Sequence, residues 1–267
     1  MSLGIGIVGA GGRMGRMLID VVQRQPGTHL AAATDRSGGE AVGRDAGELA
    51  GQGALGVRVG DDIDAAVAAS DAVIDFSLPE ATETVAAACA RNGRPLVLGT
   101  TGLGEAQPAA IDGLAQQVAV MQAANYSTGV TLLTALVEQA ARAIGAQSDI
   151  EIIEAHHRHK VDAPSGTALR LGEAVADALG RDLRQCAVYG REGQTGERDR
   201  QTIGFETIRA GDIVGEHTVL FGGDGERIEL THKASSRTTF AAGAVRAATW
   251  LVEQPPGRYD MRDLIGV

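Results

Sequence analysis

A glycine-rich segment between two regular elements limits the folds open to this chain. Residues 9–15 read Gly-Ala-Gly-Gly-Arg-Met-Gly; they follow a short apolar run at 5–8 and precede a helical pattern at 13–24. Glycine at such a turn permits positive φ and a close approach of the backbone to a ligand. Further apolar runs alternate with helical patterns, at 29–34, 72–75, 95–98 and 118–121. This alternation predicts an α/β fold with a doubly wound parallel sheet.

The pattern changes after residue 126. Helical stretches at 128–144 and 167–179 flank a strand candidate, and three strand candidates without intervening helices follow at 203–209, 214–221 and 227–232. The turns between these three contain Gly and Asp, which is typical of hairpins. We therefore predict a C-terminal α+β domain with a mostly antiparallel open sheet. The predicted bounds are 1–126 for the first domain and 127–236 for the second, with 237–267 packing back on the first.

Composition excludes several classes of protein. The formal net charge of −10 does not suit binding to nucleic acid or to an anionic membrane. Apolar runs are too short for a membrane span, and no signal peptide is recognisable. The two cysteines, Cys89 and Cys186, lack CxxC spacing, which favours reduced thiols and a cytoplasmic protein. The polar segment 190–201 is either a solvated loop or an arm that reaches a neighbouring subunit.

An acidic residue supports a ligand at the glycine turn. The spacing Gly9-x-x-Gly12-x-x-Gly15 is a variant of the commoner dinucleotide-binding pattern. Asp35 follows Gly15 by twenty residues, at the end of the second strand, where a carboxylate meets adenosine ribose hydroxyls. The adjacent Arg36 can instead pair with a 2′-phosphate. We therefore predict mixed use of NADH and NADPH. The alternatives are a plain tight turn for the glycines and a solvated charge for Arg36.

Two later loops follow strands of the same sheet. The loop Gly99-Thr100-Thr101 offers hydroxyls and amides for a nicotinamide amide group, because loops at the carboxyl ends of strands line the ligand crevice. The alternative is that the threonines cap the next helix. Residues 123–126 end the fifth strand and are expected to mark the hinge.

A basic run in the middle of the chain is the strongest functional signal. Five potentially cationic side chains occupy 156–160, and a Pro-Ser-Gly-Thr step at 164–167 opens a helix. Imidazole and ammonium groups beside an amide-rich helix start suit a small molecule with several carboxylates. We assign proton transfer to His156 and Lys160, and carboxylate binding to His157 and to residues 165–167.

Alternatives for this region remain open. Asp162 fits a supporting partner or a turn residue better than a reactant. Arg237 either closes the pocket or is a first-turn residue of the last helix. The histidines are alternatively metal ligands, but HExxH spacing is absent and Arg158 and Lys160 oppose a cation, so no metal is predicted. A solvated basic stretch without function is the remaining alternative.

Several motifs together resemble one family. They are the segments 9–16, 99–102, 154–167, 210–218 and 232–237. Over nearly the whole chain the sequence resembles the 4-hydroxy-tetrahydrodipicolinate reductase (dihydrodipicolinate reductase) family. The resemblance implies a cytoplasmic homotetramer with a Rossmann domain and a substrate-binding and tetramerisation domain. It also implies the NADH- or NADPH-dependent reduction of 4-hydroxy-tetrahydrodipicolinate, with loss of water, in diaminopimelate and lysine biosynthesis.

The resemblance also implies roles for individual residues. It places catalysis at His156 and Lys160, and substrate binding at His157, Lys160, Ser165, Gly166 and Thr167. Cofactor contacts carry over to Gly9, Ala10, Gly11, Gly12, Arg13, Met14, Asp35, Arg36, Gly99, Thr100, Thr101, Ala123, Ala124, Asn125 and Tyr126. Asp35 stands where many members have Glu, which leaves the preference between NADH and NADPH open. Rival hypotheses are an NAD(P)-dependent amino-acid dehydrogenase of the aspartate or diaminopimelate type, a non-catalytic nicotinamide-binding sensor and a metal-binding module.

Overall fold

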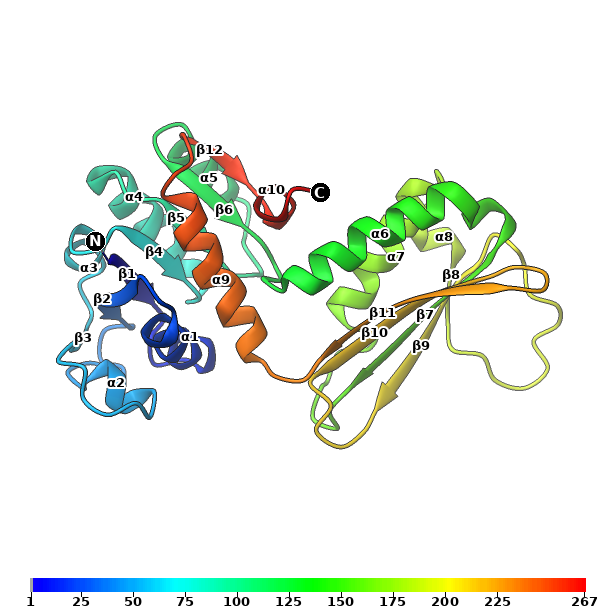
Figure 1. Cartoon of the computed structure of the whole chain (residues 1–267), viewed down its shortest axis with the longest axis horizontal. Coiled ribbons are helices and arrows are strands. Elements are labelled where there is room, and N and C mark those ends of the chain that lie inside the picture. Colours follow the sequence, from blue (N-terminus) through cyan, green and yellow to red (C-terminus); the bar gives the residue numbers. More distant parts are fainter. Residues whose placement is uncertain (1) are drawn as a thin grey trace. The chain divides into compact units, whose positions relative to one another are not determined.

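The computed structural model describes residues 2–267 (Figure 1); Met1, the first residue of the first predicted domain, lies outside the described residues. The chain forms two compact units. One comprises the residues up to Ser127 together with Thr238–Gly266, and the other comprises Thr128–Arg237.

The first unit is built on a seven-stranded sheet in which every strand pair is parallel. Its order is β12-β6-β5-β4-β1-β2-β3. The strands are β1 (Leu3–Val8), β2 (Thr28–Thr34), β3 (Val59–Gly60), β4 (Ala72–Asp75), β5 (Leu96–Leu98), β6 (Ala119–Gln122) and β12 (Gly257–Tyr259). The predicted α/β class is confirmed. The sequence did not reveal β3 and β12, because their residues, Val-Gly and Gly-Arg-Tyr, form no apolar run.

Helices cover both faces of this sheet. One apolar core joins the sheet to α1 (Arg13–Arg24) and α9 (Thr238–Leu251). A second core lies on the opposite face under α3 (Ile63–Ala68), α4 (Thr82–Asn92) and α5 (Gln107–Ala115). Because successive strand residues point to opposite faces, Ile7 enters the first core and Val8 the second. The short helices are α2 (Ala46–Leu49), η1 (Pro79–Ala81) and α10 (Met261–Ile265).

Gly15 allows α1 to pack closely on the turn that precedes it. A Cβ at this position would lie 2.2 Å from the carbonyl oxygen of Gly9 and 2.6 Å from Cα of Ala10. Backbone atoms cannot move aside as a flexible side chain can, so we expect Gly15→Ala to destabilise the protein by about 1–3 kcal/mol. Urea unfolding measures this change.

The matched control is Gly113 in α5, whose Cβ would meet nothing within 4 Å. Gly113→Ala should stabilise the protein by roughly 0.5–1 kcal/mol, because alanine loses less conformational entropy than glycine in a helix. Equal effects of the two substitutions would contradict this account of the turn.

The second unit is a five-stranded sheet with its helices on one face (Figure 1). The order is β11-β10-β7-β9-β8. Its strands are β7 (Asp149–His156), β8 (Ala187–Tyr189), β9 (Ile203–Arg209), β10 (Gly215–Gly222) and β11 (Arg227–Ala234). The helices α6 (Thr128–Ile144) and α7 (Gly166–Ala178) enclose the core with this sheet. Two short helices complete the unit, η2 (Gly145–Gln147) and α8 (Leu183–Cys186).

The sheet of the second unit corrects one expectation. It is mixed rather than mostly antiparallel, because β7 and β8 pair with β9 in parallel. The turn after β9 is also not a hairpin, since β7 lies between β9 and β10. This turn crosses the end of β7 instead, where the amide of Ala210 donates to the carbonyl of His156. The turn after β10 does form an antiparallel hairpin with β11, as predicted.

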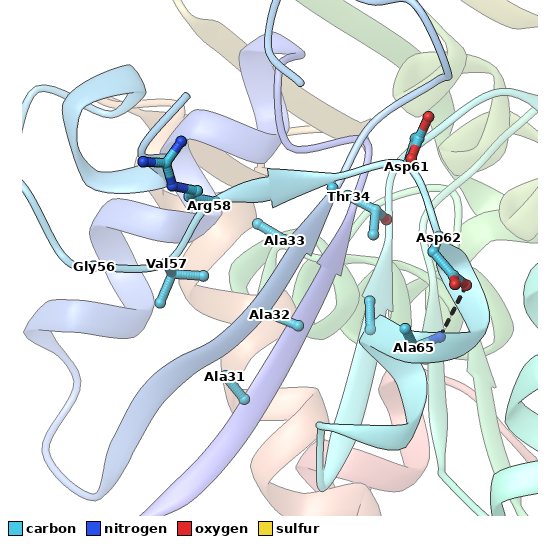
Figure 2. A pocket seen from close by; sticks show the side chains of 12 residues that line it. Ala31, Ala32, Ala33, Thr34, Gly56, Val57, Arg58, Asp61, Asp62 and Ala65 are labelled. Carbon is cyan, nitrogen blue, oxygen red and sulfur yellow. Dashed lines mark hydrogen bonds between the residues drawn. The ribbon is translucent and has the colours of Figure 1, made fainter. Parts of the chain in front are cut away.

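A hollow of about 440 Å³ lies in the first unit beside β2 (Figure 2). Alanines 31–33 form part of its wall, and Arg58, Asp61 and Asp62 are exposed at its edge. Thr34 also lines it, so the hollow adjoins the strand end that carries Asp35.

Candidate functional site

Strand β7 places two titratable side chains on the face that the helices cover. Glu154 and His156 continue the alternation of Ile150 and Ile152, which lie in the core beneath α6 and α7. The exposed fractions are 1 % for Glu154 and 9 % for His156, so both are buried. A buried ionisable group is costly unless it is paired, and the contacts of Glu154 meet this requirement.

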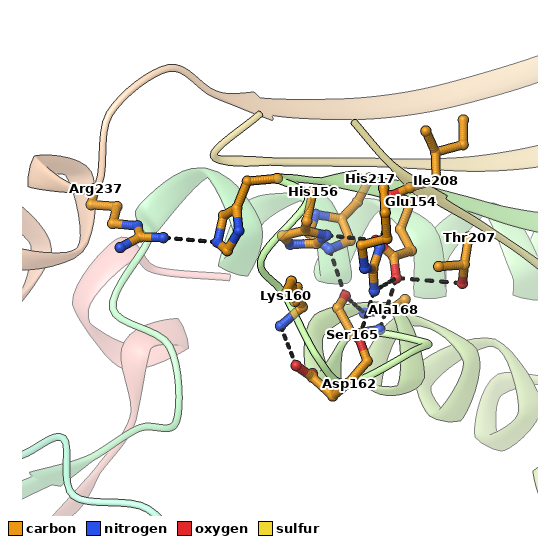
Figure 3. Close-up of polar contacts among 12 residues, drawn as sticks. Glu154, His156, Lys160, Asp162, Ser165, Ala168, Thr207, Ile208, His217 and Arg237 are labelled. Carbon is orange, nitrogen blue, oxygen red and sulfur yellow. Dashed lines mark hydrogen bonds and ion pairs between the residues drawn. The ribbon is translucent and has the colours of Figure 1, made fainter. Parts of the chain in front are cut away.

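The carboxylate of Glu154 is the centre of a polar cluster (Figure 3). Arg209 on β9 donates to it from both terminal nitrogens, at 2.8 and 2.9 Å. Nδ1 of His156 lies 2.5 Å from Oε2, and the amide of Ser165 donates to Oε1 at 3.0 Å. Burial alone would raise the pKa of Glu154. The hydrogen bonds from Arg209, His156 and Ser165 outweigh it and lower that pKa, so the group is ionised at neutral pH.

The imidazole of His156 is held against this carboxylate and has limited space on its other side. Burial lowers its pKa, and the positive charges of Lys160 and Arg209 act in the same direction, against the opposing effect of Glu154. The ring is therefore mostly neutral at pH 7. A Cβ at Gly215 on β10 would lie 3.1 Å from Nε2 of His156, so glycine leaves room at this nitrogen.

Lys160 lies in the bend that follows β7. Its ammonium group forms an ion pair of 2.9 Å with Asp162, and this contact lowers the pKa of the Asp162 carboxyl. Arg209 donates to the carbonyl of Asp162 at 2.6 Å, which ties the bend to β9. The bond between Ala163 and Pro164 is cis. Asp162 thus partners Lys160, the kind of supporting role expected for it.

Ser165 begins α7 and is buried. Its hydroxyl accepts a hydrogen bond from the amide of Ala168 at 3.2 Å and lies 3.0 Å from Nε2 of His217. The backbone amide of Ser165 donates to the carboxylate of Glu154. The polar groups of Ser165 are therefore engaged within the protein. Gly166 is exposed and Thr167 is half-buried, so these two residues present the helix start to solvent.

His217 on β10 was not identified from the sequence. It pairs across the sheet with Glu154, and its ring lies 5.1 Å from the ring of His156. Burial, followed by the charge of His156, lowers the pKa of His217 to about 4. His217 is thus neutral at pH 7 and can hold the Ser165 hydroxyl.

The low pKa of His217 predicts a pH dependence of stability. The unfolded chain binds a proton near pH 6.5 and the folded chain only near pH 4, so stability is present above pH 6.5 and is lost as the pH falls toward 4. The full contribution is on the order of 3 kcal/mol. We expect His217→Asn to flatten the unfolding free energy between pH 7 and pH 4.5, as measured by urea titration. If the unfolding free energy of His217→Asn depended on pH as strongly as that of the wild type, the lowered pKa of His217 would be contradicted.

His157 and Arg237 lie together. Nη2 of Arg237 is 2.8 Å from Nε2 of His157, although the two residues are far apart in sequence (Figure 3). Desolvation and the guanidinium charge lower the pKa of His157, so it is neutral with Nε2 as the acceptor. Arg237 directly precedes α9.

Sequence reasoning also missed Arg209 and the role of Glu154. A signal for both exists in the period-two alternation of strands. Glu154 and His156 alternate on β7, and their register partners on β9 are Thr207 and Arg209. Finding these contacts required the order of the strands, which the sequence pattern did not provide.

The glycine turn in the first unit fits a dinucleotide. Gly9 has φ of 84°, and Gly12 caps α1 without a side-chain hydrogen bond, so the start of a twelve-residue helix stays open. The amide of Gly11 donates to Oδ2 of Asp35 at 2.6 Å, and a Cβ at Gly11 would lie 2.2 Å from that oxygen. Ala10 is buried and Met14 half-buried, whereas Arg13 and Arg36 are exposed. An open amide terminus beside a carboxylate suits a pyrophosphate and a ribose.

The loops after β5 and β6 expose only some of the predicted residues. Thr101 is exposed, Gly99 is half-buried and Thr100 is buried. The threonines do not cap α5, which begins at Gln107 after an Ala106 cap. Ala124 is exposed, while Ala123 and Asn125 are half-buried. Tyr126 is buried, and its hydroxyl donates to carbonyls of Leu98 and Met121 at 2.9 and 3.1 Å.

Residues 2–267 contain no group of three or more His, Cys, Asp or Glu side chains placed to hold a metal ion. Within the same range, each helix is too short or too polar to cross a membrane.

Comparison with known proteins covers the whole chain. The family described as dihydrodipicolinate reductase, N-terminus, matches residues 3–126, and the one described as its C-terminus matches residues 129–265. The chain is 88 % identical over 267 residues to 4-hydroxy-tetrahydrodipicolinate reductase of Halorhodospira halophila, and 68 % identical to the enzyme of that name from Alkalilimnicola ehrlichii; both chains are covered completely in each case.

The fold is shared with solved structures, one of which bears the name of the matched family. It is a dipicolinate-bound dihydrodipicolinate reductase from a Paenisporosarcina species, with a TM-score of 0.78 and 23 % identity. The alignment covers 99 % of this chain and 100 % of that one. On the two family matches and the full-length relatives, the chain belongs to the dihydrodipicolinate reductase family.

Proposed function

We propose that this protein reduces 4-hydroxy-2,3,4,5-tetrahydrodipicolinate to tetrahydrodipicolinate with NADH or NADPH and releases water, as a step of diaminopimelate and lysine biosynthesis. The names of the full-length relatives support the reaction. The observation that carries the proposal is the buried pair of Glu154 and His156 beside Lys160 and the start of α7. This cluster combines a proton-exchanging group with donors for anions.

The substrate carboxylates are held by side-chain and amide donors of this site. Lys160 and the Nδ1–H group of the neutral His157 donate to one carboxylate. The exposed start of α7 at Gly166 and Thr167 donates to the other. Ser165 contributes by fixing that helix start, because its hydroxyl and amide bond within the protein. Charge-assisted hydrogen bonds of this kind contribute about 1.5–3 kcal/mol each. The dipicolinate in the Paenisporosarcina structure has two carboxylates, which supports this class of ligand.

The chemistry divides between this site and the cofactor. The ring loses its 4-hydroxyl as water, and the reduced nicotinamide, when bound, supplies a hydride to the conjugated ring. His156 exchanges a proton with the ring carbon, and a positioned donor of this type gives about 10²–10⁴-fold in rate. Lys160 supplies a positive charge and acts as a second proton donor. Its ion pair with Asp162 holds the ammonium group in the bend.

Residues 9–14 would hold the cofactor, with the open start of α1 available to its pyrophosphate. Asp35 would accept from the ribose hydroxyls, and the exposed Arg36 would meet a 2′-phosphate. The loops 99–101 and 123–126 would supply the remaining contacts. The neighbouring Asp35 and Arg36 support the use of both NADH and NADPH.

The protein works as a cytoplasmic homotetramer in this proposal. The sheet face turned away from α6 and α7 carries Ile153, Ile208 and Leu220, and Ile208 is 47 % exposed. An exposed apolar sheet face suits association between subunits. Both cysteines are unpaired, in keeping with a reducing compartment. Light scattering behind size-exclusion chromatography tests the tetramer.

The function is tested by steady-state kinetics on the purified protein. Hydroxy-tetrahydrodipicolinate is generated enzymatically, and the oxidation of NADH and of NADPH is followed. We expect turnover with both cofactors, and none when aspartate or diaminopimelate is offered with NAD⁺ or NADP⁺. Ammonia release in the second assay, without turnover in the first, would establish an amino-acid dehydrogenase instead.

A further inference from the structure

We propose that Glu154 is a positioning residue, which fixes His156 in the tautomer with its proton on Nδ1 and fastens that imidazole to the start of α7. The inference rests on the proposed function, in which His156 exchanges the proton. Glu154 itself is fully covered by its neighbours and acts through His156.

The tautomer follows from the partners of the carboxylate. The Arg209 nitrogens and the Ser165 amide can only donate, and an ionised carboxylate can only accept. The contact of 2.5 Å between Oε2 and Nδ1 of His156 is therefore a hydrogen bond only when Nδ1 carries the proton. In the neutral ring this leaves the lone pair on Nε2, which becomes the atom that takes up and releases a proton.

The same carboxylate joins two parts of the site. Oε2 accepts a hydrogen bond from the imidazole of His156, and Oε1 accepts one from the amide of Ser165, which begins α7. Arg209 bridges both oxygens and holds the plane of the carboxylate. A change at Glu154 should therefore alter the proton donor and the anion-binding helix start together.

Several titratable and charged groups around His156 bear on its pH dependence. Glu154 lies on its own strand, Arg209 on β9, His217 on β10 and Lys160 in the following bend. Lys160 and Arg209 lower the pKa of His156, and Glu154 raises it. Glu154 therefore keeps His156 protonatable closer to neutrality. Removing the negative charge should move the pH at which activity falls, on the alkaline side of the kcat profile, to lower values.

The experiment compares Glu154→Gln, Glu154→Asp and the wild-type protein. The tautomer of His156 is read by ¹⁵N NMR on histidine-labelled protein, with the signal assigned through His156→Asn. We expect the wild type to show a single neutral form with the proton on Nδ1, and Glu154→Gln to show a mixture. We also expect kcat to fall by about 10²-fold, with its alkaline limb at lower pH. Glu154→Asp keeps the negative charge, so it should largely retain the wild-type tautomer of His156 and the wild-type kcat profile.

Glu151→Gln is the matched control. Glu151 lies on the opposite face of β7, and its carboxylate also accepts hydrogen bonds from two arginines, Arg191 and Arg198. Its substitution should leave the His156 tautomer and the alkaline limb unchanged.

Two results would overturn the proposal. One is a wild-type protein with the proton of His156 on Nε2, which decides the matter even if Glu154→Gln does not fold. The other is a folded Glu154→Gln protein with the wild-type tautomer and pH profile. Because the NMR measurement needs no turnover, a wild type that fails to reduce the substrate would reject the proposed function and leave the assignment of Glu154 to its own test.

Discussion

Replacing His156 or Lys160 by alanine is expected to lower kcat by about 10²–10⁴-fold while the protein stays folded. His156 loses the exchanging imidazole, and Lys160 loses the charge beside the reacting ring. Stability should change little at Lys160, because its ion pair with Asp162 is partly exposed and such pairs contribute about 0–1 kcal/mol. Steady-state kinetics with NADH and NADPH, together with urea unfolding, separates the two effects.

Arg158→Ala is the control from the same basic run. Arg158 is exposed, and its backbone amide donates to the carbonyl of Gly211. Its kcat should therefore stay close to that of the wild type. Near-normal turnover of both His156→Ala and Lys160→Ala would show that the assignment of catalysis to this cluster is wrong.

Arg209→Met is expected to have the largest effect on folding. The substitution leaves the Glu154 carboxylate buried and without its main counter-charge. Removing one partner of a buried ion pair typically costs about 3–5 kcal/mol. Arg209 keeps 19 % of its side chain exposed, so a loss near the lower end, about 3 kcal/mol, is expected at pH 7. Urea unfolding measures it.

The pH dependence of this loss has a definite sign. In the wild type the pKa of Glu154 is lowered, so its contribution to stability is present above the unfolded value of 4.5 and disappears as the pH falls. Without Arg209, burial dominates and the folded pKa of Glu154 should rise above 4.5. The variant should then gain on the wild type as the pH falls from 7 to 5.

Arg191→Met provides the comparison. Arg191 also binds a carboxylate of β7, that of Glu151, but on the sheet face away from the helices, and its side chain is 31 % exposed. The expected cost is below about 1 kcal/mol. A cost at Arg209 no larger than that at Arg191 would contradict the importance of burial at Glu154.

Local patterns predicted the elements whose signals lie within a few neighbouring residues. The helix over 13–24 agrees with α1, and the helix over 128–144 agrees with α6, because helical periodicity is visible within each segment. The end of α4 is also a local signal, because Gly93 follows its last residue with a φ of 61° that favours glycine. The basic run at 156–160 was likewise identified from the sequence, because its five side chains are consecutive.

Long-range pairing limited the rest of the prediction. The sequence indicated turn chemistry after β9, but a turn pattern does not reveal that β7 lies between β9 and β10. The same insertion brings Arg209 and His217 to either side of β7, so their partnership with Glu154 and His156 depends on strand order. The roles predicted for individual cofactor residues, including Tyr126, stay predictions.

The return of α9 and β12 to the first unit has a consequence for synthesis of the chain. α9 supplies Ala244, Val245 and Leu251 to the core around Ile5 and Leu18, and β12 extends the sheet beyond β6. The ribosome therefore synthesises every strand of the second unit before it synthesises α9 and β12, which complete the first unit. Residues up to Ser127 are synthesised first, but their core is complete only when α9 and β12 have been added. Until the chain is released, we therefore expect the first unit to be more exposed to proteases and chaperones than the second.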